Sequence, residues 1–212
     1  MPVSAFTVRG PAGDLQAVLE LPAPERFAQP LGVAVIAHPH PLFGGTMDNK
    51  VVHTLARAWL QCGWRAVRFN FRGVGASAGA YDEGKGEVQD MLAVIAQAAA
   101  PGEALALAGF SFGACMAARA MDSLHPARPI TSAVLVGAAA SHFTLPAIAR
   151  DLQARTLLVH GEQDDVAPLA ATLDWARPQL LPVTVVPGSG HFFHGQLPLL
   201  KALAARHVRG CA

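Results

Sequence analysis

The 212-residue chain is poor in charged residues and in cysteine. Only 15% of its residues are charged, and 16 Lys and Arg balance 15 Asp and Glu. A net charge of +1 supplies no basic surface that would attract nucleic acid, so we expect no nucleic-acid partner. Three widely separated cysteines are too few for a disulfide framework or a zinc cluster. This cysteine usage predicts a cytoplasmic protein, because the cytoplasm is reducing.

The chain also lacks a long apolar run, although 52% of its residues are hydrophobic and 41 are alanine. One long stretch without Asp, Glu, Lys or Arg covers residues 129–149. Its apolar core, residues 130–140, is 11 residues long, whereas a membrane-spanning helix needs about 20. The first residues lack the basic and apolar regions of a signal peptide. We therefore expect residues 1–212 to form a single domain with a buried core and no membrane partner.

Apolar segments with strand-like and helix-like patterns alternate along the chain. Strands are predicted over residues 5–9, 15–21, 32–37, 65–71, 105–108, 130–136, 156–160 and 183–186. Helices are predicted over residues 48–61, 86–100, 111–122, 167–176 and 198–207. The first two strands should pair antiparallel across a short turn. The rest of the alternation predicts an α/β fold, a mostly parallel sheet of about eight strands with helices on both faces. Ligands of such sheets bind at the carboxyl ends of the strands.

Residues 109–113 read Gly-Phe-Ser-Phe-Gly, between a predicted buried strand and a predicted helix. In so tight a turn, side chains two residues before and after the serine would clash with neighbouring backbone, and glycine avoids this clash. The pattern predicts that Ser111 is a nucleophile exposed on a strained turn. The helix that follows would favour negative charge developing beside it. The alternative is an ordinary serine cap of that helix.

Carboxylates and histidines follow the last two predicted strands. Asp164 and Asp165 come after the first of these strands, and His191 and His194 after the second. The chain order is therefore serine, acid, histidine, as in hydrolases with a nucleophile elbow. Because all of these residues follow carboxyl ends of strands, they can converge on one site. The order alone does not separate Asp164 from Asp165.

These motifs give the chain a resemblance to the α/β-hydrolases over nearly its whole length. It resembles small bacterial members that carry a His-Pro-His-Pro segment followed by two glycines, here residues 38–45. Residues 70–77 resemble the loop that these proteins carry after their next strand. Dienelactone-hydrolase-like and serine-peptidase-like esterases are near relatives. The resemblance implies an α/β-hydrolase fold and a catalytic triad of Ser111, Asp164 and His191. Asp165 would then be a loop or helix-cap residue, and His194 a surface residue.

The resemblance further implies an oxyanion hole formed by the backbone N–H groups of Phe112 and His40. Pro39 and Pro41 have no N–H group and cannot be the donor from the loop after residue 37, which narrows the choice of that donor. His38 is expected to bond nearby backbone. A metal site at His38 and His40 is disfavoured, because no further ligand follows at a typical spacing. We expect no metal and no cofactor.

Three further features have structural interpretations. The glycine-rich residues 73–78 and 79–85 mimic nucleotide-binding patterns, but neither has the required strand and helix around it. Arg72 is expected to anchor this loop. Cys115, four residues after Ser111, is expected to be a small buried residue rather than a nucleophile.

The short chain leaves little to cover the site. Only residues 137–154 separate two successive strands, which is room for one crossover helix around residues 145–153. We therefore expect a lidless site with an apolar substrate pocket that includes Phe43, Phe110 and Phe192. The predicted function is hydrolysis of small or medium carboxylic esters through an acyl-enzyme. Peptidase, thioesterase or lactonase activity with the same triad is the alternative, as is a non-catalytic binding protein on this fold. The sequence leaves open whether the protein is a monomer or a homodimer.

Overall fold

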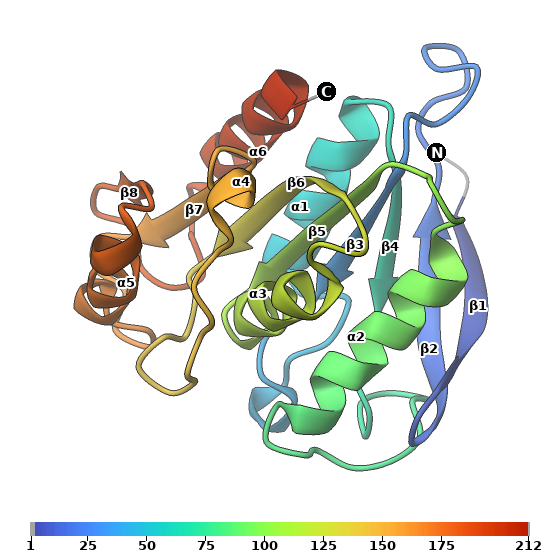
Figure 1. Ribbon diagram of the computed structural model, residues 1–212, viewed down its shortest axis with the longest axis horizontal. Coiled ribbons are helices and arrows are strands. Elements are labelled where there is room, and N and C mark those ends of the chain that lie inside the picture. The colour runs from blue at the N-terminus through green and yellow to red at the C-terminus, as the bar shows by residue number, and fades with distance from the viewer. Residues whose placement is uncertain (1–2, 212) are drawn as a thin grey trace.

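The computed structural model describes residues 3–211, in which eight strands form one sheet in the order β1-β2-β4-β3-β5-β6-β7-β8 (Figure 1). The strands are β1 (Val3–Gly10), β2 (Gly13–Glu20), β3 (Val33–Ala37), β4 (Arg65–Phe69), β5 (Leu105–Phe110), β6 (Ile130–Val136), β7 (Thr156–Gly161) and β8 (Val183–Val186). The helices are η1 (Pro41–Phe43), α1 (Lys50–Gln61), α2 (Lys85–Ala98), α3 (Phe112–Leu124), α4 (Arg150–Gln153), α5 (Leu169–Ala176), η2 (Arg177–Gln179) and α6 (Leu197–Cys211).

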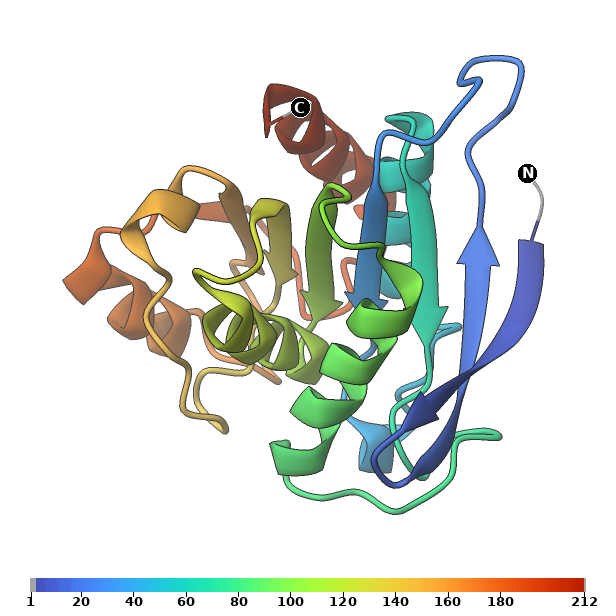
Figure 2. The same ribbon diagram turned by 45° about the vertical axis from the view of Figure 1, so that its right-hand side comes forward.

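The sheet is parallel except at one edge. There β1 pairs antiparallel with β2, and β2 pairs antiparallel with β4 (Figure 2). The remaining neighbours are all parallel, from β4 through β3 and β5 to β8. The predicted fold class, including the antiparallel first pair, is confirmed. The parallel strands thus bring their carboxyl ends to a common edge, where the loops that carry the candidate site residues meet.

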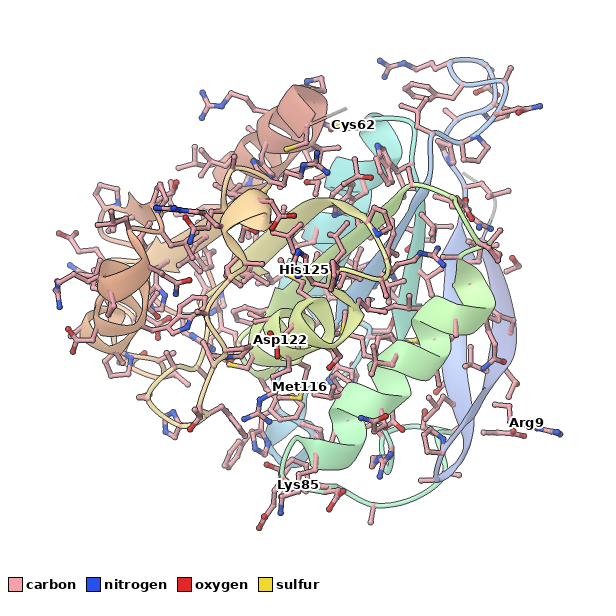
Figure 3. The ribbon with its side chains drawn as sticks, in the orientation of Figure 1. Arg9, Cys62, Lys85, Met116, Asp122 and His125 are labelled. Atoms are coloured by element: carbon pink, nitrogen blue, oxygen red, sulfur yellow. The ribbon has the colours of Figure 1, made fainter. Side chains whose placement is uncertain are left out.

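Helices cover both faces of the sheet. In Figure 1, α2 and α3 lie in front of it and α1 lies behind it. The side chains of β3 alternate accordingly: Val35 belongs to the core under α2 and α3, and Ile36 to the core under α1 and α6. At the end of α1, Cys62 lies against α6 (Figure 3), and its Sγ donates to the Ala205 carbonyl at 3.4 Å. Both faces of the inner strands are therefore buried, as their continuous apolar sequences predict.

The segment between β6 and β7 is less helical than its sequence predicts. A helix over residues 145–153 is expected, but α4 covers only Arg150–Gln153. Pro146 has no N–H group, and its carbonyl accepts from Trp175 Nε1 at 3.0 Å. The N–H of Ile148 donates to Gln179 Oε1 at 2.8 Å. This backbone is held by α5 and η2 instead of by its own helical bonds, so most of the predicted helix is a loop.

The helices are also short. The longest, α6, has 15 residues and lays its apolar side chains against the sheet and α1. Within residues 3–211, no helix has both the length and the apolar character to cross a membrane.

Candidate active site

Ser111 lies on a strained turn between β5 and α3. Its backbone has φ 57° and ψ −117°, in a region where residues other than glycine are rare. A Cβ atom on Gly109 would lie 2.1 Å from the Gly113 carbonyl oxygen, and one on Gly113 would lie 2.4 Å from the Ala37 carbonyl oxygen. The steric reason for both glycines is therefore confirmed. The N–H of Ser111 donates to the Val136 carbonyl at 2.8 Å, which ties the turn to β6.

Asp164 and His191 form a buried pair. His191 Nδ1 and Asp164 Oδ2 are 2.7 Å apart, and both side chains are almost inaccessible to solvent. The other carboxylate oxygen accepts from the N–H groups of Val166 (3.1 Å) and Ala167 (2.7 Å). Burial acts to raise the pKa of Asp164, but the hydrogen bonds from His191 and Ala167 outweigh it and lower that pKa. The carboxylate thus accepts from Nδ1, and the lone pair of a neutral His191 ring lies on Nε2.

The competing residues lie elsewhere. Asp165 and His194 are both exposed, and neither takes part in the buried pair. Of the two roles expected for Asp165, loop residue or helix cap, the structure shows the first, because Asp165 lies on the loop between β7 and α5. The N-cap of α5 is Pro168, without a side-chain bond, and Glu162 accepts from the N–H of Gly188 at 2.8 Å. Glu162 therefore links the loop after β7 to the loop after β8.

Ser111 and His191 line the same cavity, of about 590 Å³, at the carboxyl edge of the sheet. The other lining residues are Pro39, His40, Phe43, Gly44, Gly45, Asn49, Phe112, Ala139, His142, Phe143, Val166 and Phe192. Within residues 3–211, no Asp, Glu, Lys or Arg lines it. The structure thus brings a serine and a carboxylate-paired histidine to one largely apolar, uncharged cavity.

The two backbone groups expected to bind an oxyanion also lie at this cavity. His40 and Phe112 both line it, and their N–H groups have no hydrogen-bond partner in the part of the chain that the structure describes. The His40 side chain accepts from the N–H of Leu42 through Nδ1 (3.2 Å) and lies 3.1 Å from the Tyr81 hydroxyl through Nε2. Both ring nitrogens are therefore occupied, and the ring fixes the short η1 turn at the cavity.

His38 has the structural role that the sequence predicts. It is fully buried, its Nδ1 donates to the Pro39 carbonyl at 2.6 Å, and its Nε2 accepts from the N–H of Phe71 at 3.0 Å. Burial lowers its pKa to about 4, although the bond to Pro39 opposes the change. The ring is thus neutral at pH 7 and links the loop after β3 to the loop after β4.

This neutral ring predicts a loss of stability in acid. Between pH 6.5 and about 4, the unfolded chain protonates His38 while the folded protein does not. This contribution to stability is therefore fully present above pH 6.5 and declines as pH falls through that window. A pKa shift of this size corresponds to a contribution of ~3 kcal/mol to the free energy of unfolding. We expect the free energy of unfolding of the wild type to fall by ~3 kcal/mol more than that of His38→Gln between pH 7 and pH 4. Urea titrations at several pH values measure this difference, and parallel pH profiles would contradict it.

The aromatic residues expected at the substrate pocket divide into two groups. Phe43 and Phe192 line the cavity, and Phe43 is 86% exposed. Phe110 does not line it: β5 extends to this residue, and its side chain is fully buried in the core on the α1 and α6 face. Its ring lies 4.8 Å from that of His191, so it supports the histidine from the core. The expectation that Phe110 contacts substrate is wrong for this reason.

Phe110 and Phe43 should therefore respond differently to truncation. Phe110→Ala removes a fully buried ring, so we expect a loss of ~3–5 kcal/mol in the free energy of unfolding. Phe43→Ala should change that free energy by less than about 0.5 kcal/mol but raise KM for apolar substrates. Denaturant titration and steady-state kinetics on the two variants test the distinction. Equal stabilities of the two variants would contradict the assignment.

Phe143 is an aromatic residue of the cavity wall that was not predicted from the sequence. Its ring lies 5.1 Å from that of Phe112, and Arg119 lies over it at 5.9 Å. Arg119 also donates to the Thr144 carbonyl at 2.9 Å. Phe143 follows β6, so its position in a loop at the carboxyl edge of the sheet was the feature of the sequence that could have identified it as a cavity residue.

Two structural expectations near the site are met. The Arg72 guanidinium donates to both carboxylate oxygens of Asp90 (2.7 and 2.9 Å) and to the Gly86 carbonyl (2.8 Å), so it anchors its loop to α2. A Cβ atom on Gly86 would collide with this guanidinium, which explains the glycine there. Cys115 is fully buried, and burial raises the pKa of its thiol to about 12. Its thiol is therefore not a nucleophile at neutral pH. Within residues 3–211, no three His, Cys, Asp or Glu side chains are grouped so as to hold a metal ion.

Comparison with known proteins agrees with this architecture. The family model described as serine aminopeptidase, S33, matches residues 29–149. A Xanthomonas campestris protein, described as an α/β serine hydrolase without lid, has a crystal structure with a TM-score of 0.85 and 35% identity, covering 99% of this chain and 96% of that one. For an α/β serine hydrolase homologue from Coxiella burnetii, the TM-score is 0.81 and the identity 37%, with 96% of each chain covered.

A curated relative matches over a shorter segment. An uncharacterized protein of Rickettsia prowazekii (strain Madrid E) is 42% identical over 88 residues, or 40% of this chain. The match spans 37% of that protein's length. The family model, in contrast, covers more than half of the 212 residues, and the two structural relatives cover nearly all of them. The chain therefore belongs to the serine aminopeptidase S33 family and is a small, lidless member of the α/β-hydrolase superfamily.

Proposed function

We propose that this serine hydrolase cleaves small or medium, uncharged carboxylic esters through an acyl-enzyme. The observation that carries the proposal is the 2.7 Å hydrogen bond between Asp164 and His191, on a cavity that also exposes the strained Ser111. A buried carboxylate that orients an imidazole beside a serine is the arrangement that activates a hydroxyl for nucleophilic attack.

Each residue then has a defined role. Ser111 Oγ attacks the carbonyl carbon while His191 Nε2 takes the hydroxyl proton, and Asp164 stabilises the imidazolium that forms. The negative charge on the carbonyl oxygen is bound by the N–H groups of Phe112 and His40. Collapse of this intermediate breaks the ester C–O bond, and His191 donates its proton to the departing alcohol. Water, activated by the same histidine, then hydrolyses the acyl-enzyme.

The cavity lining favours uncharged substrates. Phe43, Phe143 and Phe192 offer apolar contacts, and among residues 3–211 no carboxylate lines the wall. An aminopeptidase must bind the free ammonium group of its substrate, for which a carboxylate is the usual partner. Esters are therefore favoured over amino-terminal peptides, whereas thioesters and lactones remain alternatives for the same triad. The other alternative, a non-catalytic binding protein on this fold, is disfavoured because the histidine, its carboxylate and the serine are all present.

A panel of substrates tests this proposal. We would compare kcat/KM for short p-nitrophenyl esters, an aminoacyl p-nitroanilide, an acyl thioester and an aliphatic lactone. The proposal predicts the highest value for the esters, with butyrate and similar acyl groups above charged ones. Turnover of the p-nitroanilide without turnover of any ester would contradict it.

We further propose a small-molecule partner and a cytoplasmic location, without a cofactor. The location is supported by Cys62, Cys115 and Cys211, which are free thiols and suit a reducing compartment. The oligomeric state is a separate question that sedimentation of the purified protein answers.

A further inference from the structure

His160, near the end of β7, is a buried histidine that lies outside the cavity but next to Asp164. Its side chain is fully buried, and Nε2 lies 2.7 Å from the Ala167 carbonyl oxygen and 3.3 Å from Asp164 Oδ2. Because a carbonyl oxygen only accepts, the proton of this ring is on Nε2. Within the described residues, Nδ1 has no hydrogen-bond partner. The ring therefore presents one N–H to the loop that carries Asp164 and leaves its other nitrogen bare.

Ala167 connects this histidine to the carboxylate. The Ala167 carbonyl accepts from His160, and the Ala167 N–H donates to Asp164 Oδ1 at 2.7 Å. The opposite oxygen, Oδ2, is the one that bonds His191. The backbone of Ala167 is thus held by His160 of β7 through its carbonyl, and it binds the Asp164 carboxylate through its N–H. Since β7 is paired on both sides, with β6 and β8, the histidine is fixed to a rigid element.

Packing alone does not explain a histidine at this position. The preceding residues of the strand, Leu158 and Val159, are buried and apolar. An apolar residue of similar size would fill the same space without burying an unpaired nitrogen, which costs free energy. The N–H group of the His160 ring points to the loop that carries Asp164.

We propose that His160 is a positioning residue that holds the carboxylate of Asp164 in the position where it hydrogen-bonds His191. This inference rests on the proposed function, because it assumes that the Asp164–His191 pair acts in catalysis. The positive edge of a neutral imidazole, 3.3 Å from Oδ2, favours the carboxylate without adding a second full cation beside it. A cation there would compete with the imidazolium of His191 for the same oxygen. Burial lowers the pKa of His160, which keeps the ring neutral.

A matched pair of substitutions tests the role. Glutamine and methionine have similar length and volume, but only glutamine can place an N–H near the position of Nε2. We expect His160→Met to lower kcat on the order of 10- to 100-fold, by analogy with the loss of residues that orient the ligands of a catalytic metal, with KM within about twofold. His160→Gln should restore most of the loss. The titratable groups that face His160 are Asp164 and His191. The acid limb of the pH profile of kcat/KM should therefore move in His160→Met and stay near that of the wild type in His160→Gln.

The readouts separate this inference from the proposed function. Fluorophosphonate labelling of Ser111 counts active sites, so each kcat refers to folded enzyme, and the labelling rate reports on the triad without any ester. If no ester is turned over but Ser111 is labelled, the labelling rates of the variants still test His160. Equal rates for wild type and His160→Met would overturn the proposal, as would a loss in His160→Gln as large as in His160→Met. If His160→Met does not fold, His160→Asn replaces it, since its shorter amide cannot reach Ala167. Failure to label the wild type at Ser111 overturns both proposals.

Discussion

Replacement of Ser111 by alanine is expected to reduce kcat for ester hydrolysis by roughly 10⁴- to 10⁶-fold. The variant removes the only atom that forms the covalent bond to the acyl group, whereas His191, Asp164 and the cavity remain. Alanine keeps the Cβ atom and tolerates the positive φ of 57° no better or worse than serine. The fold and the affinity for substrate should therefore change little. Steady-state kinetics with p-nitrophenyl esters, together with far-UV circular dichroism, measure both expectations.

Ser141→Ala is the matched control. Ser141 is an exposed serine next to His142, which lines the same cavity, and its hydroxyl lies 2.8 Å from His142 Nδ1. It therefore also forms a serine–histidine contact, but without a buried carboxylate behind the ring. We expect full activity in this variant. A Ser111→Ala protein that retained wild-type activity would contradict the acyl-enzyme mechanism.

Asp164→Asn should have the second-largest effect, a loss of about 10⁴-fold in kcat. The amide of asparagine would donate to His191 Nδ1, which moves the ring proton to Nε2. The histidine would then face Ser111 with a donor instead of an acceptor and could not take its proton. KM should change little, because Asp164 does not line the cavity. Kinetics at several pH values measure the effect, and the activity of the variant should rise at high pH as alternative bases take over.

Asp165→Asn makes the same chemical change one residue along the chain. Asp165 is exposed and takes no part in the bond to His191. Activity close to wild type is expected, and the contrast between the two variants identifies which carboxylate acts. Similar losses in both would show that the general charge of the loop matters instead of the oriented bond.

The sequence predicted the parts of the fold that depend on local patterns. Continuous apolar runs fixed the inner strands, and β6 and β8 begin and end where predicted. The turn around Ser111 followed from the glycine spacing, because the clash it avoids lies within a few residues of the serine. Arg72 was recognisable as a loop anchor because few charged residues lie near it in the chain.

Other features depend on contacts between distant segments. Phe110 is a core residue because β5 runs two residues beyond its predicted end. The helix predicted over residues 145–153 is mostly loop because Trp175 and Gln179 bind its backbone groups. His160 gave a signal, a histidine in an apolar strand, but its importance lies in an Ala167 carbonyl that only the folded chain brings beside it. No local pattern contains these partners.

The identity of the nucleophile is the central claim, and covalent labelling tests it most directly. The purified protein would be treated with a fluorophosphonate, and intact-mass and peptide mass spectrometry would locate the adduct. We expect one adduct per chain, on Ser111, that is absent from Ser111→Ala and forms slowly in Asp164→Asn. An unmodified Ser111 in a protein that hydrolyses esters, or an adduct on another residue, would contradict it.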